Sequence, residues 1–184
     1  NGWGDCGILK SFRDWAYDRG ETIRATTSFL MADSTTPDGD YIKPQTNPTN
    51  TDCWNGKAYT PLNQLTPGRT KYGTNNNVRI FRYADVLLMN AEAKIKNGKS
   101  GDAPFNEVRR RAQMPELTNV TFEQVIDERR MELVCEWGER YNDLVRTGLA
   151  KTELKGWSED KALLPLPFNQ YTQIPDLLKE PKDE

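Results

Sequence analysis

The sequence predicts a mainly α-helical fold in which packed helical pairs carry long irregular loops and minor β-structure. Three observations predict it. Apolar residues recur with helical spacing from residue 82 to about residue 148. Start and stop signals divide that stretch into separate helices. Before it, residues 1–77 are rich in Gly, Pro, Asn and Thr, so turn signals are too dense for long elements.

The length of 184 residues is enough for one domain with its own core. We expect a single domain with a loop-rich aromatic segment at 1–77, a helical core at 78–150 and an extended tail at 151–184. In the first segment, short strands are expected only at 22–30 and 78–81. The tail contains LLPLPFNQ, whose alternating prolines favour an extended conformation.

The first expected helix, RYADVLLMNAEAKIKNG at 82–98, is apolar on two sides. At about 100° per residue, Val86, Met89 and Ala93 lie on one flank. The opposite flank carries a larger apolar set: Ala84, Leu87, Leu88, Ala91 and Ile95. A lone surface helix needs one apolar stripe, so two stripes predict neighbours on both sides. Gly98 is expected to end this helix.

The next three helices are marked by capping residues. Asp102 is expected as the N-cap of the second helix, with Pro104 in its first turn. Thr121 begins the third helix as the N-cap of a capping box with Gln124. Its expected apolar stripe consists of Phe122, Val125, Ile126, Leu133 and Trp137. Past Gly138, a fourth helix places Tyr141, Leu144 and Val145 inward and ends at Gly148.

Two charged residues, Arg129 and Glu136, project within the apolar stripe of the third helix. An unpaired charge there would cost several kcal/mol in desolvation. We therefore expect a structural ion-pair network in which Arg129 meets Glu136, Glu132 or Glu92. The alternative is a carboxylate pair for glycoside hydrolysis. It is disfavoured because carboxylates paired with Arg stay ionised, which is the wrong state for a general acid.

Several classes of site are excluded by composition. The chain has no histidine, which removes Ser-His-Asp and Cys-His catalysis and histidine-ligated metals. Cys6, Cys53 and Cys135 lack a C-x-x-C spacing, so neither a metal site nor a cofactor is expected. A Cys6–Cys53 disulfide remains open, and Cys135 is expected as a small buried side chain within a helix.

Nucleic acid is not an expected partner, because the net charge is −2 and no basic face is apparent. No apolar run approaches 18 residues, so we expect no transmembrane segment. The chain opens at NGWGDC without an initiator Met or an apolar signal region. We therefore expect a fragment of a longer protein, with any targeting signal removed or upstream.

The phrases RYADVLLMNAEA and ERRMELVCEWGERYNDLVRTG resemble the C-terminal region of the SusD/RagB family. The run APFNEVRRRA and the tail LLPLPFNQYTQIPDL resemble it as well, so the likeness extends from Val78 to about Leu178. It implies a mostly helical, surface-exposed lipoprotein of the Gram-negative outer membrane, anchored by a lipid outside this chain. Such proteins bind starch or other glycans without cleaving them and deliver them to a SusC-like TonB-dependent transporter. Family members are much longer, which again implies a fragment.

The family signature transfers no binding residue, so site candidates come from chemistry. A glycan site needs flat aromatic rings for stacking, flanked by polar groups for hydrogen bonds. The segment TDCWNGKAY supplies Asp52, Trp54, Asn55, Lys57 and Tyr59, and the further candidates are Tyr41 and Tyr72. The alternative is that the aromatic residues anchor an irregular loop onto the helices.

Two other functions remain open at this stage. One is a helical scaffold that holds a protein partner and no sugar, and the less favoured one is a carboxylate glycosidase. The sequence also leaves open which glycan is bound, whether the ligand is a peptide, and whether the site lies in this chain.

Overall fold

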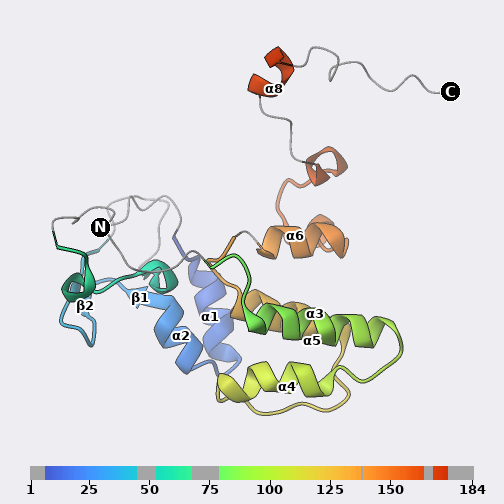
Figure 1. Ribbon diagram of the computed structural model, residues 1–184, viewed down its shortest axis with the longest axis horizontal. Helices are drawn as coiled ribbons and strands as arrows, with labels where there is room; N and C mark the ends of the chain where they lie inside the picture. The colour runs from blue at the N-terminus through green and yellow to red at the C-terminus, as the bar shows by residue number, and fades with distance from the viewer. Residues whose placement is uncertain (1–6, 45–52, 68–78, 138, 164–167, 174–184) are drawn as a thin grey trace. The chain divides into compact units, whose positions relative to one another are not determined.

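The computed structural model describes residues 7–44, 53–67, 79–137, 139–163 and 168–173 (Figure 1). The chain forms two compact units, residues 1–140 and residues 141–184. Helices dominate the described residues and strands are short, so the predicted mainly α-helical class is confirmed.

The first unit begins with two helices, continues through short strands and turns, and ends in three longer helices. The first group comprises α1 (Lys10–Asp18), α2 (Ile23–Ser28), β1 (Phe29–Met31), β2 (Ser34–Thr35), β3 (Tyr41–Ile42), β4 (Cys53–Asn55), η1 (Gly56–Ala58) and η2 (Leu62–Gln64). The longer helices are α3 (Tyr83–Lys96), α4 (Asp102–Arg111) and α5 (Phe122–Glu132). Two antiparallel pairs, β1 with β4 and β2 with β3, make up the described sheets.

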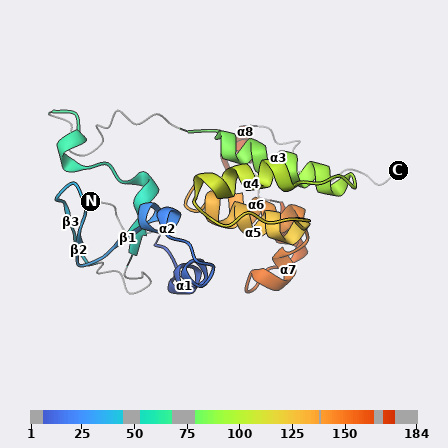
Figure 2. The ribbon, with the colours of Figure 1, turned by 90° about the horizontal axis from the view of Figure 1, so that it is seen from below.

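The main core lies where α3 packs against α4 and α5, which run side by side with it (Figure 2). From α3 it receives one of the two predicted flanks, including Leu88 and Ala91, both fully buried. Phe105 and Val108 of α4 and Val125 of α5 complete this core. The predicted inward direction of Leu88, Ala91 and Val125 is therefore confirmed.

The second apolar flank of α3 has a different environment. Val86 is 47% exposed and Met89 is 42% exposed, and Ala93 is exposed as well. The neighbour predicted for this flank is not found among the described residues.

The capping box at the start of α5 is confirmed. The backbone N–H of Gln124 donates to Oγ1 of Thr121 at 3.3 Å. In return, the backbone N–H of Thr121 donates to Oε1 of Gln124 at 2.9 Å. Val120 and Val125, which flank this cap, are both buried in the main core. The start of α5 is therefore capped as the local sequence predicts.

The end of α5 corrects the prediction. The helix stops at Glu132, whereas the expected apolar stripe continued to Trp137. Cys135 and Trp137 have φ values of 61° and 23°, so helical spacing no longer applies there. Trp137 is 65% exposed, and Cys135 is exposed in a turn rather than buried in a helix.

The start of α4 also differs from the expectation. Its N-cap is Gly101, which lies so close to α3 that a Cβ would come within 2.9 Å of the Ala91 carbonyl oxygen. Asp102 instead accepts hydrogen bonds from the amides of Asn119 (3.0 Å) and Val120 (2.9 Å). These bonds lower the pKa of Asp102 and join the start of α4 to the start of α5.

The strand predicted at 22–30 is wrong for most of its length, because Ile23–Ser28 form α2 and strand begins only at Phe29. Hydroxyls of β-branched residues bond back along the helix: Oγ1 of Thr26 donates to the Thr22 carbonyl at 2.9 Å. Arg24 of this helix also makes tertiary ion pairs with Glu128 and Glu132. The described part of the second predicted strand, 79–81, contains no strand, and Val78 lies outside the described residues.

The second unit contains most of α6 (Glu139–Arg146), then α7 (Ala150–Glu153), η3 (Glu159–Ala162) and α8 (Phe168–Gln173). Leu144 is buried as expected, and Gly148 follows α6 with φ of 75°, where a glycine is favoured. The prediction of an extended tail at 151–184 is wrong for its described residues, which include the end of α7, η3 and α8. The prolines at 165 and 167, on which that prediction depended, lie outside the described residues. In the described ranges, no helix has both the length and the apolar character needed to cross a membrane.

Replacing the N-cap hydroxyl should weaken the helical core measurably. Thr121→Ala removes the acceptor for the Gln124 amide and should lower the free energy of unfolding by about 1 kcal/mol. Thr121→Ser retains the acceptor and serves as the control. Urea denaturation would measure both, and equal midpoints for Thr121→Ala and wild type would contradict the role of the cap.

Candidate functional site

The candidate site is a short part of the loop-rich region 1–77. It consists of residues 53–59, and from here on the name aromatic segment refers to these residues alone. Its first part is β4, which pairs antiparallel with β1 so that Trp54 lies opposite Leu30. The η1 turn follows, and its Gly56 packs directly against α2. A Cβ at Gly56 would lie 2.1 Å from the Thr27 carbonyl oxygen, so only glycine permits this approach.

Lys57 joins the aromatic segment to the C-terminal end of α5. Its Nζ donates to Oε1 of Glu136 at 2.7 Å and to the backbone carbonyl of Glu132 at 2.5 Å. Burial lowers the pKa of Lys57, although the bond to Glu136 acts in the opposite direction. The segment is therefore attached to α2 by backbone packing and to α5 by a partly buried ammonium group.

Each described aromatic candidate uses its polar atom within the protein. Trp54 is half-buried, and its Nε1 donates to the Lys43 carbonyl at 3.0 Å. The Tyr59 hydroxyl donates to Asp40 at 2.5 Å. Tyr41 is 54% exposed, and its hydroxyl donates to Asp33 at 2.6 Å. What these residues can offer a ligand is thus chiefly ring surface.

The hydroxyls of Tyr41 and Tyr59 both donate hydrogen bonds to carboxylates. The hydrogen bond to Asp33 raises the pKa of Tyr41. Burial, followed by the bond to Asp40, raises the pKa of Tyr59. In the same pair, the bond from Tyr59 and one from the Leu62 amide lower the pKa of Asp40. Asp33 and Asp40 therefore each already accept a hydrogen bond from a tyrosine hydroxyl.

The remaining sequence candidates have other positions. Asn55 caps η1, because its Oδ1 accepts from the Lys57 amide at 2.9 Å. Asp52 and Tyr72 lie outside the described residues, as does Cys6, so the proposed Cys6–Cys53 pairing does too. Tyr41, Trp54 and Tyr59 remain as the described aromatic candidates.

The sequence does not identify the residues that bond the tyrosine hydroxyls, which are Asp33, Thr36 and Asp40. Thr36 lies 3.1 Å from the Tyr59 hydroxyl, and Asp40 reaches the same hydroxyl across 19 positions of sequence. The available signal was the turn sequence PDGDY, in which Gly39 has φ of 89° and reverses the chain between β2 and β3. That signal predicts a turn but not which side chains it brings together.

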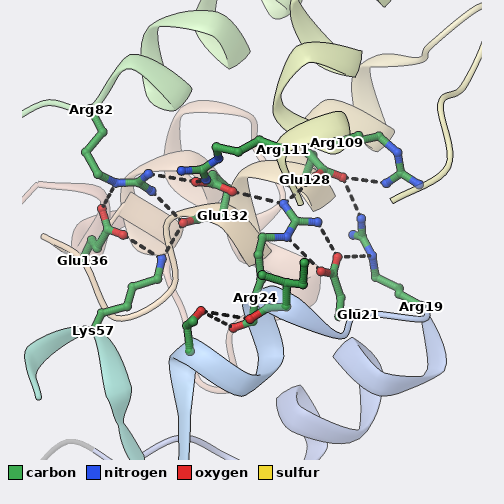
Figure 3. Close-up of polar contacts among 12 residues, drawn as sticks. Arg19, Glu21, Arg24, Lys57, Arg82, Arg109, Arg111, Glu128, Glu132 and Glu136 are labelled. Atoms are coloured by element: carbon green, nitrogen blue, oxygen red, sulfur yellow. Dashed lines mark hydrogen bonds and ion pairs between the residues drawn. The ribbon is translucent and has the colours of Figure 1, made fainter. Parts of the chain in front are cut away.

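A buried ion-pair network centred on α5 is joined to the aromatic segment through Lys57 (Figure 3). Glu128 is fully buried and accepts from three arginines: Arg24 at 2.6 Å, Arg19 at 2.9 Å and Arg109 at 2.9 Å. Glu21 accepts from Arg24 as well, at 2.5 Å. Partners from α2, α4 and the end of α1 thus converge on one carboxylate of α5.

Glu132, one turn further along α5, continues the network. It accepts from Arg24 at 3.2 Å, from Arg82 at 2.8 Å and also from Arg111. Arg82 then reaches Glu136 at 2.7 Å. The network therefore extends from α2 through α5 to the residue that holds Lys57.

The partner expected for Arg129 needs correction. Arg129 was expected to meet Glu136, Glu132 or Glu92, but its Nη1 donates to Asp85 of α3 at 2.6 Å, and Glu139 lies 3.5 Å away. Asp85 is only 7% exposed, so it faces the packed side of α3 rather than solvent.

The three carboxylates expected to meet Arg129 have other ion pairs. Glu132 and Glu136 pair with Arg82, and Glu92 lies 3.2 Å from Lys96.

Two carboxylates of the network, Glu132 and Glu136, are unsuited to general-acid chemistry. Burial alone would raise the pKa of Glu132, but the bond from Arg82 and the charge of Arg111 outweigh it and lower the pKa. Arg82 and Lys57 lower the pKa of Glu136 in the same way. An ionised carboxylate cannot donate the proton that glycoside cleavage requires. Among the described residues, no three Cys, Asp or Glu side chains gather as metal ligands.

The model of the SusD family matches residues 8–175. The chain is 33% identical over 119 residues to SusD-like protein P38 of Formosa agariphila, covering 55% of this chain and 24% of that protein. It is 36% identical over 81 residues to the starch-binding protein SusD of Bacteroides thetaiotaomicron, covering 44% of this chain and 14% of that protein.

Solved structures show the same fold. Surface glycan-binding protein A from Bacteroides thetaiotaomicron superposes with a TM-score of 0.79 and 29% identity, over 97% of this chain and 41% of that one. Surface glycan-binding protein A from Bacteroides thetaiotaomicron in complex with laminarihexaose has a TM-score of 0.78 and 28% identity. This match covers 97% of this chain and 42% of that one. The chain thus spans less than half the length of these proteins.

Breaking the buried Arg129–Asp85 pair should destabilise the protein strongly. Arg129→Ala leaves Asp85 as an uncompensated buried charge and should cost about 3 to 5 kcal/mol in unfolding free energy. Arg110→Ala is the matched control, because Arg110 pairs with Glu116 at the surface, where both side chains are more than half exposed. It should cost below about 1 kcal/mol. Chemical denaturation would test this, and equal losses in the two variants would contradict burial of the Arg129 pair.

The protein should also lose stability in acid. Glu132 and Glu136 have pKa values below the ordinary value of 4.5, so the unfolded chain takes up protons that the folded chain does not. Their stabilising contribution is therefore present at neutral pH and is lost as the pH falls below about 5. Denaturation midpoints measured between pH 7 and pH 3 should show it. Glu136→Gln should make this dependence shallower, and an unchanged slope would contradict the assignment.

Proposed function

Because the chain belongs to the SusD family, which its match over residues 8–175 shows, we propose that it takes part in non-catalytic glycan binding at the cell surface. The observation that carries the proposal is the likeness to a surface glycan-binding protein solved with laminarihexaose, which extends over 97% of this chain. The starch-binding protein SusD supports the same ligand class. Starch and other polysaccharides or oligosaccharides are the candidate ligands.

Within this chain, we propose the aromatic segment and the adjoining β2–β3 hairpin as the contact region. Tyr41 is the most exposed of the three aromatic candidates, with 54% of its surface accessible. Trp54 and Tyr59 are half-buried. Flat aromatic surfaces suit the apolar C–H faces of sugar rings, and adjacent polar groups can orient the hydroxyls.

The wider setting is also a proposal. Residues 1–184 form a single C-terminal domain of a longer protein that is lipid-anchored and exposed on the outer membrane. That protein would deliver its glycan to a SusC-like TonB-dependent transporter. The family match and the partial coverage of the longer relatives support this view.

A second candidate, a helical scaffold that binds a protein and no sugar, is favoured by one observation. The polar atoms of Trp54, Tyr59 and Tyr41 are all bonded within the protein, as expected for residues that anchor a loop. In that case the aromatic residues would contribute to stability and not to affinity.

Glycan titrations on the full-length protein would separate the two functions. Trp54→Ala and Tyr41→Ala should each weaken binding of laminarihexaose or a starch oligosaccharide by about 1 to 3 kcal/mol, the usual loss on truncating a well-placed aromatic residue. Tyr17→Ala is the matched control, because Tyr17 is a 49% exposed aromatic residue on α1, outside both the aromatic segment and the β2–β3 hairpin. It should leave the affinity unchanged.

The experiment can also decide against the proposal. Unchanged affinity in the Trp54 and Tyr41 variants, together with a lower melting temperature, would identify these residues as loop anchors and place the ligand site elsewhere. Release of reducing sugar by the wild-type protein would overturn the non-catalytic assignment, because no poised acid is expected here.

A further inference from the structure

We propose that Trp137 is a further glycan-contact residue, and that the exposed Arg79 side chain beside it bonds sugar hydroxyls. The inference rests on the proposed glycan binding and extends its contact region beyond the aromatic segment and the β2–β3 hairpin. Trp137 belongs to the predicted apolar stripe of the third helix, but α5 ends at Glu132 and Trp137 is 65% exposed. Exposing an apolar side chain of this size to water is unfavourable, so its position needs an explanation.

The backbone of the turn after α5 directs Trp137 away from the helical core. Cys135 has φ of 61° and Trp137 has φ of 23°, and positive values are uncommon for residues with a side chain. Such conformations persist only where the surrounding contacts hold them, and they gather at ligand sites. The outward position of Trp137 is therefore a property of the turn and does not result from fraying of the helix.

The indole group of Trp137 is attached at its polar atom. Its Nε1 donates a hydrogen bond to the backbone carbonyl of Arg79. The preceding residue, Glu136, accepts from Lys57 and from Arg82 at 2.7 Å each (Figure 3). Because the indole N–H is bonded within the protein, Trp137 presents chiefly apolar ring surface to solvent. That surface is suited to stacking on the C–H face of a sugar.

The same turn adjoins the aromatic segment. Nδ2 of Asn55 donates to the Cys135 carbonyl at 3.5 Å, and Nζ of Lys57 donates to Oε1 of Glu136 at 2.7 Å. Nη2 of Arg79 donates to the Lys57 carbonyl at 3.5 Å. These bonds place the turn that carries Trp137 directly beside residues 55–57. A glycan held at the aromatic segment would therefore find a further stacking surface next to it.

Arg79 supplies the polar group that a sugar site requires. Its side chain is exposed, and a guanidinium group has five N–H donors, of which the bond to Lys57 uses one. Ile80 and Phe81, the next residues, are 70% and 76% exposed, so a protein segment is the competing occupant. A guanidinium beside the ring favours the sugar, since its donors can bond hydroxyls that an apolar protein face lacks.

Hydroxyl-radical footprinting of the full-length protein tests the contact directly. The radical oxidises accessible tryptophan and tyrosine side chains, and mass spectrometry measures the extent at each residue. Saturation with laminarihexaose or maltohexaose, whichever the wild type binds, should lower the oxidation of Trp137 several-fold. Tyr17 is the reference residue, because it is a 49% exposed aromatic residue on α1. Its oxidation should not change.

Substitutions separate stacking from a purely structural role. Trp137→Ala removes the ring and should weaken binding of the same oligosaccharide several-fold in a calorimetric titration. Trp137→Phe loses the N–H but retains a flat aromatic ring, so it should keep most of the affinity. Arg79→Ala removes the guanidinium group and leaves the backbone carbonyl that accepts from Trp137. It should also weaken binding, with the melting temperature unchanged.

Three results would overturn the inference. Slow oxidation of Trp137 without ligand, relative to Tyr17 and corrected for intrinsic reactivity, would show that another part of the full-length protein covers the ring. Unchanged affinity in Trp137→Ala, or an equal loss in Trp137→Phe, would show that stacking is not its role. Loss of binding in Trp54→Ala and Tyr41→Ala, with Trp137 unprotected by ligand, would refute this inference alone. Failure of the wild type to bind either oligosaccharide would instead refute the proposed function, and this inference with it.

Discussion

The buried carboxylates of Glu128 and Glu132 determine how the elements of residues 1–140 must be arranged. A charge removed from water is tolerated only if oppositely charged donors surround it. Those donors come from other elements, with Arg24 on α2 reaching both carboxylates, and Arg109 on α4 and Arg82 before α3 reaching one each. If any of these elements moved away from α5, a buried carboxylate would lose one of its charged partners. The network thus acts as a set of distance restraints among segments far apart in sequence.

Local signals allowed part of this fold to be predicted from sequence. The capping box of Thr121 lies within four residues, so its geometry follows from the local chain alone. The packed flank of α3 follows from the helical spacing of its apolar residues. The existence of an ion-pair network followed from charges in an apolar stripe, but its partners did not. Arg129 reaches Asp85 across 44 positions of sequence, and periodicity contains no information about such a pairing.

The candidate site was predictable in residue type but not in contacts. The sequence indicated Tyr41, Trp54 and Tyr59 as candidates because aromatic side chains beside polar ones are suited to binding sugars. Their hydrogen-bond partners depend on how the β2–β3 hairpin folds over the aromatic segment, which is a tertiary property. The α2 region shows the same limit, since β-branched residues favoured strand while the pairing of Arg24 with Glu128 required helix.

The contact of Gly56 with the Thr27 carbonyl has a consequence for ligand recognition. The backbone of the aromatic segment has little freedom at this point, because packing restrains it on one side and Lys57 on the other. A ligand that stacks on Trp54 or Tyr59 would meet surfaces already held in place, so little conformational entropy would be lost on association. Changes in selectivity within such a protein would then arise by exchanging side chains on a fixed backbone rather than by reshaping the loop.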